Sequence, residues 1–122
     1  MYEYYASFID NYDGDTYTFS VSLGFDIHHT LTVRLLGCDT YEMKDKDPAK
    51  RALAKKATEM AKNILQNAKT IIVKTVKDDQ DKYGRYLATI TTEDKSGVKI
   101  DLTRILTEAN LTTGKWTNPA PV

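Results

Sequence analysis

The sequence predicts a small, mainly β protein with two helices, of the α+β class, and the order of its patterns carries this prediction. Three short segments rich in β-branched and aromatic residues come first, and two more follow a long segment of helical periodicity. A shorter helical pattern lies near the C-terminus. This order suggests a small β-barrel, although periodicity alone does not show whether the barrel closes.

The first three predicted strands are separated by turn signals. They span residues 2–9, 16–23 and 29–36. The pair Asp13-Gly14 is typical of a tight turn between the first two strands. Every second residue of the third strand is apolar, which places Arg34 on the opposite face of that strand.

A long helix is predicted to begin at Asp47, its N-cap, with Pro48 at the first helical position. Apolar residues recur at helical spacing to about Asn67. Two strands and a short helix follow, with Asp101 as the N-cap of that helix and Asn110 ending it in a left-handed conformation. These strands span residues 71–76 and 86–92, the short helix spans 102–109, and turns are expected at 78–84 and 94–97.

Length and composition fit one soluble globular domain. The chain has 122 residues, 41% of them hydrophobic, and no apolar run approaches the roughly 18–20 residues of a membrane span. The domain is expected to cover residues 1–111, with residues 112–122 as a mobile tail. The single cysteine, Cys38, excludes an intrachain disulfide framework and is predicted to be a small buried side chain.

We therefore expect no membrane association and a cytoplasmic monomer by default. A secreted protein that has lost its signal peptide and a larger assembly are the alternatives.

Charge is zero overall but unevenly distributed. Residues 1–43 carry seven acidic residues against one arginine, whereas residues 44–69 carry eight basic residues against three acidic ones. A neutral protein lacks the global basic field that drives non-specific DNA binding, and the acidic first third fits a cation site. The basic segment is interpreted as the solvated face of the predicted helix, with a phosphate-binding patch as the alternative.

Three motifs combine carboxylates that can hold a hard cation with arginines that can clamp a phosphate. They read DGDT at 13–16, RLLGCDTYE at 34–42 and DKYGR at 81–85. Such groups are the equipment of a metal-dependent phosphodiesterase. In this order, over about residues 5–111, they resemble the staphylococcal nuclease family. The resemblance implies a five-stranded OB-type β-barrel with two packed helices.

The resemblance also implies a calcium site. Asp15, Asp39 and the carbonyl of Thr40 are the expected Ca²⁺ ligands, completed by water. Asp13 is expected near the water shell of the ion, although a purely structural turn is the alternative for this residue.

The catalytic groups implied by the resemblance are two arginines and a glutamate. Arg34 and Arg85 are expected to clamp the phosphate bidentately, with an exposed structural ion pair as the alternative for Arg34. Glu42 is expected to activate or orient the attacking water. Tyr41 stands where the family usually has proline, which makes the loop that holds Glu42 less rigid.

Substrate contacts are expected from three further residues. Lys82 and Tyr83 match positions that contact nucleotide phosphate in the family, with a solvated lysine and a tyrosine packed on the barrel as alternatives. Trp116 lies about where the family has an aromatic beside the nucleotide base, and stacking there competes with simple packing of the tail. The chain stops before a further helix found in extracellular members, so weaker base contacts are expected.

The resulting hypothesis is a calcium-dependent nuclease that hydrolyses phosphodiester bonds in DNA or RNA, preferably single-stranded, and leaves 3′-phosphate ends. The rival hypothesis is a non-catalytic OB module that binds nucleic acid or a protein. A third is an intact domain working inside a larger assembly, for instance a phage or mobile-element protein. Retention of the carboxylates and both arginines argues against a non-catalytic module.

Overall fold

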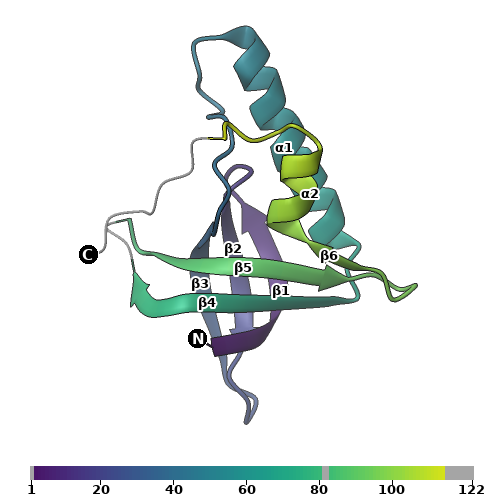
Figure 1. Cartoon of the computed structure of the whole chain (residues 1–122). Helices are drawn as coiled ribbons and strands as arrows, with labels where there is room; N and C mark the ends of the chain where they lie inside the picture. The colour runs from purple at the N-terminus through teal and green to yellow at the C-terminus, as the bar shows by residue number, and fades with distance from the viewer. Residues whose placement is uncertain (1, 81–82, 115–122) are drawn as a thin grey trace.

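The structure is a computed structural model that describes residues 2–80 and 83–114, which form a barrel with two helices at one end (Figure 1). The strands are β1 (Tyr2–Asn11), β2 (Thr16–Ser22), β3 (His28–Leu35), β4 (Thr70–Gln80), β5 (Arg85–Glu93) and β6 (Lys99–Asp101), and the helices are α1 (Pro48–Gln66) and α2 (Leu102–Glu108). Strands β1 to β5 close into a mixed barrel. The predicted α+β class and the OB-type barrel with two helices are therefore confirmed.

Closure of the barrel depends on β3 and β5, which pair in parallel, while all other neighbouring strands pair antiparallel in the order β3-β2-β1-β4-β5-β6. In the parallel pair Thr32 lies opposite Arg85, and Arg34 lies opposite Leu87. Side chains alternate between the two faces of a sheet, so both arginines project from the outer face of the barrel. Closure thus brings together two arginines from distant motifs.

The core fills the barrel and the space beneath the two helices. Helix α1 buries Ala54, Ala57, Ala61 and Leu65 at intervals of three or four residues, as expected of an amphipathic helix. Helix α2 packs beside it (Figure 1). The fully buried side chains of the barrel and α2 include Tyr17, Phe19, Val21, Val33, Leu35, Val73, Ile90, Leu102 and Leu106. Neither helix of the described residues is long and apolar enough to cross a membrane.

Both helices begin where the sequence predicts. The Asp47 carboxylate accepts a hydrogen bond from the Ala49 backbone N–H at 2.9 Å, and the Asp101 carboxylate accepts one from Thr103 at 3.1 Å. These N-caps satisfy backbone donors that have no partner inside the helix. Asn110 follows the C-cap of α2 with a φ of 58°, which confirms the predicted left-handed end of this helix.

Two elements differ from the sequence prediction. Strand β4 continues to Gln80, so the expected turn at 78–84 begins too early. Its pairing with β5 shifts register between Thr75 and Gln80. The strand is irregular there, and the polar sequence of this segment predicts a turn. Strand β6 was not predicted, because three residues are too few for a periodic pattern.

Candidate functional site

The turn between β1 and β2 places two aspartates at one end of the barrel. The Asp13 carboxylate accepts hydrogen bonds from the backbone N–H groups of Asp15 at 3.0 Å and Thr16 at 2.9 Å, which fixes the turn. Gly14 lies so close to the loop after β3 that an added Cβ would stand 2.7 Å from the Thr40 methyl group. Only glycine allows this approach, so the turn and the loop are packed into one unit.

Asp15 is the most deeply buried acidic residue of this region, with 7% of its surface exposed. Its Oδ2 atom accepts from the Thr40 backbone N–H at 3.1 Å and lies 3.3 Å from Nη1 of Arg34. Burial, reinforced by Asp13, raises the pKa of Asp15 to about 6, although Arg34 and the Thr40 N–H act in the opposite direction. An additional positive charge beside Asp15 would therefore stabilise its ionised carboxylate.

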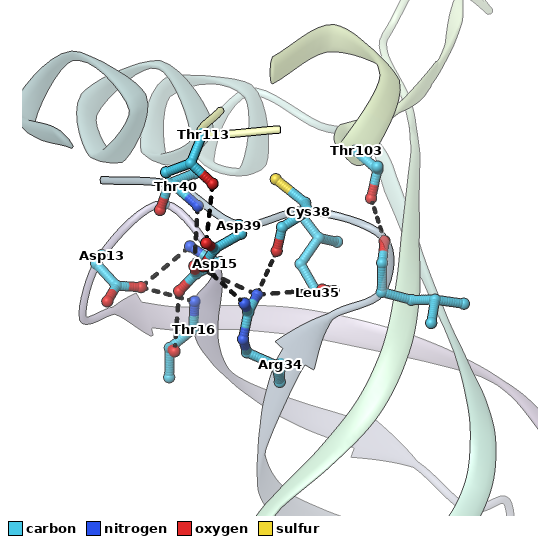
Figure 2. A network of polar contacts seen from close by, with 12 residues as sticks. Asp13, Asp15, Thr16, Arg34, Leu35, Cys38, Asp39, Thr40, Thr103 and Thr113 are labelled. Atoms are coloured by element: carbon cyan, nitrogen blue, oxygen red, sulfur yellow. Dashed lines mark hydrogen bonds and ion pairs between the residues drawn. The ribbon is translucent and has the colours of Figure 1, made fainter. Parts of the chain in front are cut away.

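Arg34 joins the two aspartates among the three predicted metal ligands (Figure 2). Its Nη2 donates to Oδ1 of Asp39 at 3.2 Å, while Nη1 faces Asp15 and also donates to the carbonyls of Cys38 and Leu35. Only 8% of Arg34 is exposed, so its ion pair with Asp15 is buried and its pair with Asp39 is partly buried. The choice between a phosphate clamp and a structural ion pair stays a prediction. For Arg34 to grip a phosphate, part of this internal network has to exchange.

The segment that follows α2 forms hydrogen bonds with Asp39. Thr113 donates to Asp39 twice, from its backbone N–H to the Asp39 carbonyl at 2.7 Å and from its hydroxyl to Oδ2 at 2.9 Å. The preceding Thr112 forms a β-bridge with Thr40. Sequence analysis assigns residues 112 and 113 to the tail, whereas here they contact the candidate site.

Arg85 approaches the same end of the barrel from β5. Its Nη1 donates to the Thr16 hydroxyl at 3.2 Å, and that hydroxyl lies 3.4 Å from Oδ1 of Asp15. The guanidinium also lies 5.1 Å from the ring centroid of Tyr83, within the range of a cation–π contact. Tyr83 is 70% exposed, so this pair lies at the surface of the protein.

A groove of about 460 Å³ runs beside the site. Its lining residues are Asp39, Thr40, Tyr41, Glu42, Asp45, Lys50 and Thr113. The predicted catalytic Glu42 is exposed and shares this groove with two of the predicted metal ligands. Asp45 and Lys50, which sequence reasoning did not assign, lie there too.

Lys82 and Trp116 lie outside the described residues, so their predicted substrate contacts stay predictions. Neither Thr113 nor the Thr16 hydroxyl, which lies between Arg85 and Asp15, was predicted from the sequence. The left-handed Asn110 is a signal that the chain turns back after α2, but nothing in the motif pattern identifies the partner of Thr113.

The donors at this site fit a hard divalent cation. They are all oxygens: the carboxylates of Asp15 and Asp39, which are predicted ligands, and the buried Thr40 hydroxyl, whose Oγ1 has no hydrogen-bond partner among the described residues. Within residues 2–80 and 83–114, no three acidic, histidine or cysteine side chains are grouped to hold an ion. A cation here would therefore take its remaining ligands from carbonyl or water oxygens.

The structure is an OB-type barrel that carries Arg34 and Arg85 beside the motif aspartates at one end. The sequence profile described as staphylococcal nuclease homologue (SNase) matches residues 32–109 of this chain. The match spans more than half of the sequence, and the chain therefore belongs to this family. No curated protein matches the chain significantly. The matched span includes Arg34, Asp39, Glu42 and Arg85, while Asp15 lies before it.

Proposed function

We propose that this protein is a calcium-dependent nuclease that hydrolyses phosphodiester bonds in DNA or RNA, preferably single-stranded, and leaves 3′-phosphate ends. One observation supports the proposal most strongly: both arginines reach Asp15, Arg34 directly at 3.3 Å and Arg85 through the Thr16 hydroxyl. Family membership independently points to a nuclease and to nucleic acid as the substrate.

Each residue of the site would have its own role in the proposed reaction. Asp15, Asp39 and Thr40 would hold the ion. Bound Ca²⁺ would offset the negative charge of the phosphate and make a nearby water more acidic. Arg85 would hold two phosphate oxygens and strengthen its grip as charge builds on them in the transition state. Glu42, exposed in the groove, would accept the proton of the attacking water or orient it.

Substrate binding would depend on few contacts. The net charge is zero, so no global basic field attracts a polyanion. The exposed ring of Tyr83 beside Arg85 offers a surface for a nucleotide, and Lys50 adds a positive charge to the groove. With few phosphates neutralised, the slope of log K against log salt should be shallow, about −1 to −3.

One observation favours the non-catalytic alternative. Arg34 is 8% exposed and its contacts among the described residues are internal, as expected of a structural residue. If Arg34 has only that role, the domain would bind nucleic acid or protein without cleaving it. Arg85 therefore gives the more decisive test, because it is half-buried whereas Arg34 is buried.

The test is degradation of end-labelled single-stranded DNA and RNA in the presence of Ca²⁺, Mg²⁺ or chelator. We expect cleavage with Ca²⁺, little with Mg²⁺, and one calorimetric Ca²⁺ site that Asp15→Ala abolishes. Arg85→Lys should lose most activity, whereas the control Arg104→Lys should not, because Arg104 is exposed on α2 and pairs only with Glu108 at 2.9 Å in the structure. Undiminished cleavage in excess chelator would refute calcium dependence, and binding without cleavage would favour the alternative.

A further inference from the structure

We infer that Thr113 is a positioning residue for Asp39, and that residues 111–113 form a clasp that sets the geometry of the candidate cation site. The inference rests on the proposed function, because it takes Asp39 as a ligand of the bound ion. It adds a residue outside the three sequence motifs.

The end of α2 directs the chain back to the site. Ala109 is the C-cap, and Asn110 adopts a left-handed conformation that reverses the chain direction. Leu111 then donates its backbone N–H to the Leu106 carbonyl at 3.1 Å and is fully buried. Because the Leu111 side chain is removed from water, the start of the clasp is firmly anchored.

The clasp then holds both the backbone and the side chain of Asp39. Thr113 donates its backbone N–H to the Asp39 carbonyl at 2.7 Å and its hydroxyl to Oδ2 at 2.9 Å. Arg34 donates to the other carboxylate oxygen, Oδ1, at 3.2 Å. The carboxylate is thus fixed from two sides, and its rotation requires that one of these bonds break (Figure 2).

The same segment links Asp39 to Asp15. Thr112 pairs with Thr40 in a β-bridge, and the Thr40 backbone N–H donates to Oδ2 of Asp15 at 3.1 Å. The clasp therefore controls where the two carboxylates stand relative to each other. Residues that orient metal ligands typically change metal affinity by about 10- to 100-fold when they are removed. We expect an effect at the lower end of this range for the loss of one hydroxyl.

The experiment compares four proteins by calorimetric titration with Ca²⁺: wild type, Thr113→Val, Thr113→Ser and Thr103→Val. Thr113→Val removes the hydroxyl but keeps the backbone donor, and Thr113→Ser restores the hydroxyl. Thr103 is the matched control, since its hydroxyl also joins α2 to the loop after β3, at 2.8 Å, but bonds to the Leu36 carbonyl instead of a carboxylate. If Thr113→Val does not fold, Thr113→Ala replaces it.

A second measurement needs no metal. Amide hydrogen exchange of Thr40, followed by NMR in chelator, reports how tightly the loop is held. We expect Thr113→Val to weaken Ca²⁺ binding about tenfold and to speed exchange at Thr40. Thr113→Ser should restore both values, and Thr103→Val should change neither.

The outcomes separate the inference from the proposed function. If wild type binds no Ca²⁺ but Thr113→Val alone speeds exchange at Thr40, the clasp stands and calcium dependence fails. If Thr113→Val changes neither affinity nor exchange, the clasp is refuted. Equal effects of Thr113→Val and Thr103→Val would also overturn it, since they would reflect a general loosening of the loop.

Discussion

Asp15 should destabilise the metal-free protein at neutral pH, and replacing it with asparagine should reveal this. Asp15 is 7% exposed, and Asp13 lies next to it in the same turn. Asp15→Asn keeps the size and the acceptor oxygen for the Thr40 N–H but removes the charge. We expect the variant to be more stable than wild type at pH 7 in chelator.

The size and direction of the effect follow from the pKa of Asp15, which rises from 3.8 to about 6 on folding. The native state therefore binds this proton more tightly than the unfolded chain does. The stabilisation is complete below pH 3.8 and is lost as pH rises through about 6. Each pKa unit corresponds to about 1.36 kcal/mol, so the advantage of Asp15→Asn should grow from near zero at pH 4 to about 3 kcal/mol at pH 7.

Urea unfolding of both proteins between pH 4 and 8, in chelator, measures this difference directly. Asp94→Asn is a control of opposite sign, because hydrogen bonds from Ser96 and Val98 lower the pKa of Asp94. Replacing the Asp94 carboxylate should therefore destabilise the native state at neutral pH, and this cost should be smaller in acid. A stability difference between wild type and Asp15→Asn that does not vary with pH would refute the reasoning, as would a variant less stable than wild type at pH 7.

Three further predictions follow from the geometry. Arg34→Lys and Arg85→Lys should each lower kcat by at least about 10²-fold. Arg34→Lys should also lower the thermal midpoint, since it gives up hydrogen bonds to the Leu35 and Cys38 carbonyls and to Asp39; an unchanged midpoint would contradict this. Gly14→Ala should destabilise by about 1–3 kcal/mol, because its Cβ would press on Thr40 at 2.7 Å, and a neutral result in urea unfolding would show that the loop yields freely. Leu111→Ala should cost about 2–5 kcal/mol in the same assay, because the side chain is fully buried; a cost below 1 kcal/mol would show that the site collapses around the smaller residue.

The parts of the fold that sequence predicts well are those set by local chemistry. Asp47 and Asp101 cap their helices because a short carboxylate can reach nearby backbone N–H groups. Asn110 tolerates a left-handed conformation that branched residues avoid. Barrel closure is different, since the parallel pairing of β3 with β5 is a long-range contact with no local periodic signal. It was expected only through the family resemblance.

The same contrast between local chemistry and long-range contacts applies to the candidate site. The motifs identify Asp15, Arg34, Asp39 and Arg85, and the structure brings them to one end of the barrel, although their roles stay predictions. What sequence could not provide is how far Arg34 is already committed to internal partners. That depends on how the loop after β3 folds over the strand. Thr113 was missed because a threonine outside a motif has no distinguishing pattern.

The parallel pairing of β3 with β5 has a consequence for when the proposed activity would arise during folding. The two strands are separated in sequence by α1 and β4, so their contact closes a long loop and is expected to be entropically costly during folding. A chain with intact hairpins but an open barrel would hold Arg34 and Arg85 apart. Under the proposed function, phosphate binding through both arginines would then be all-or-none. Partly folded chains, newly made or heat-damaged, would not cleave the nucleic acid around them.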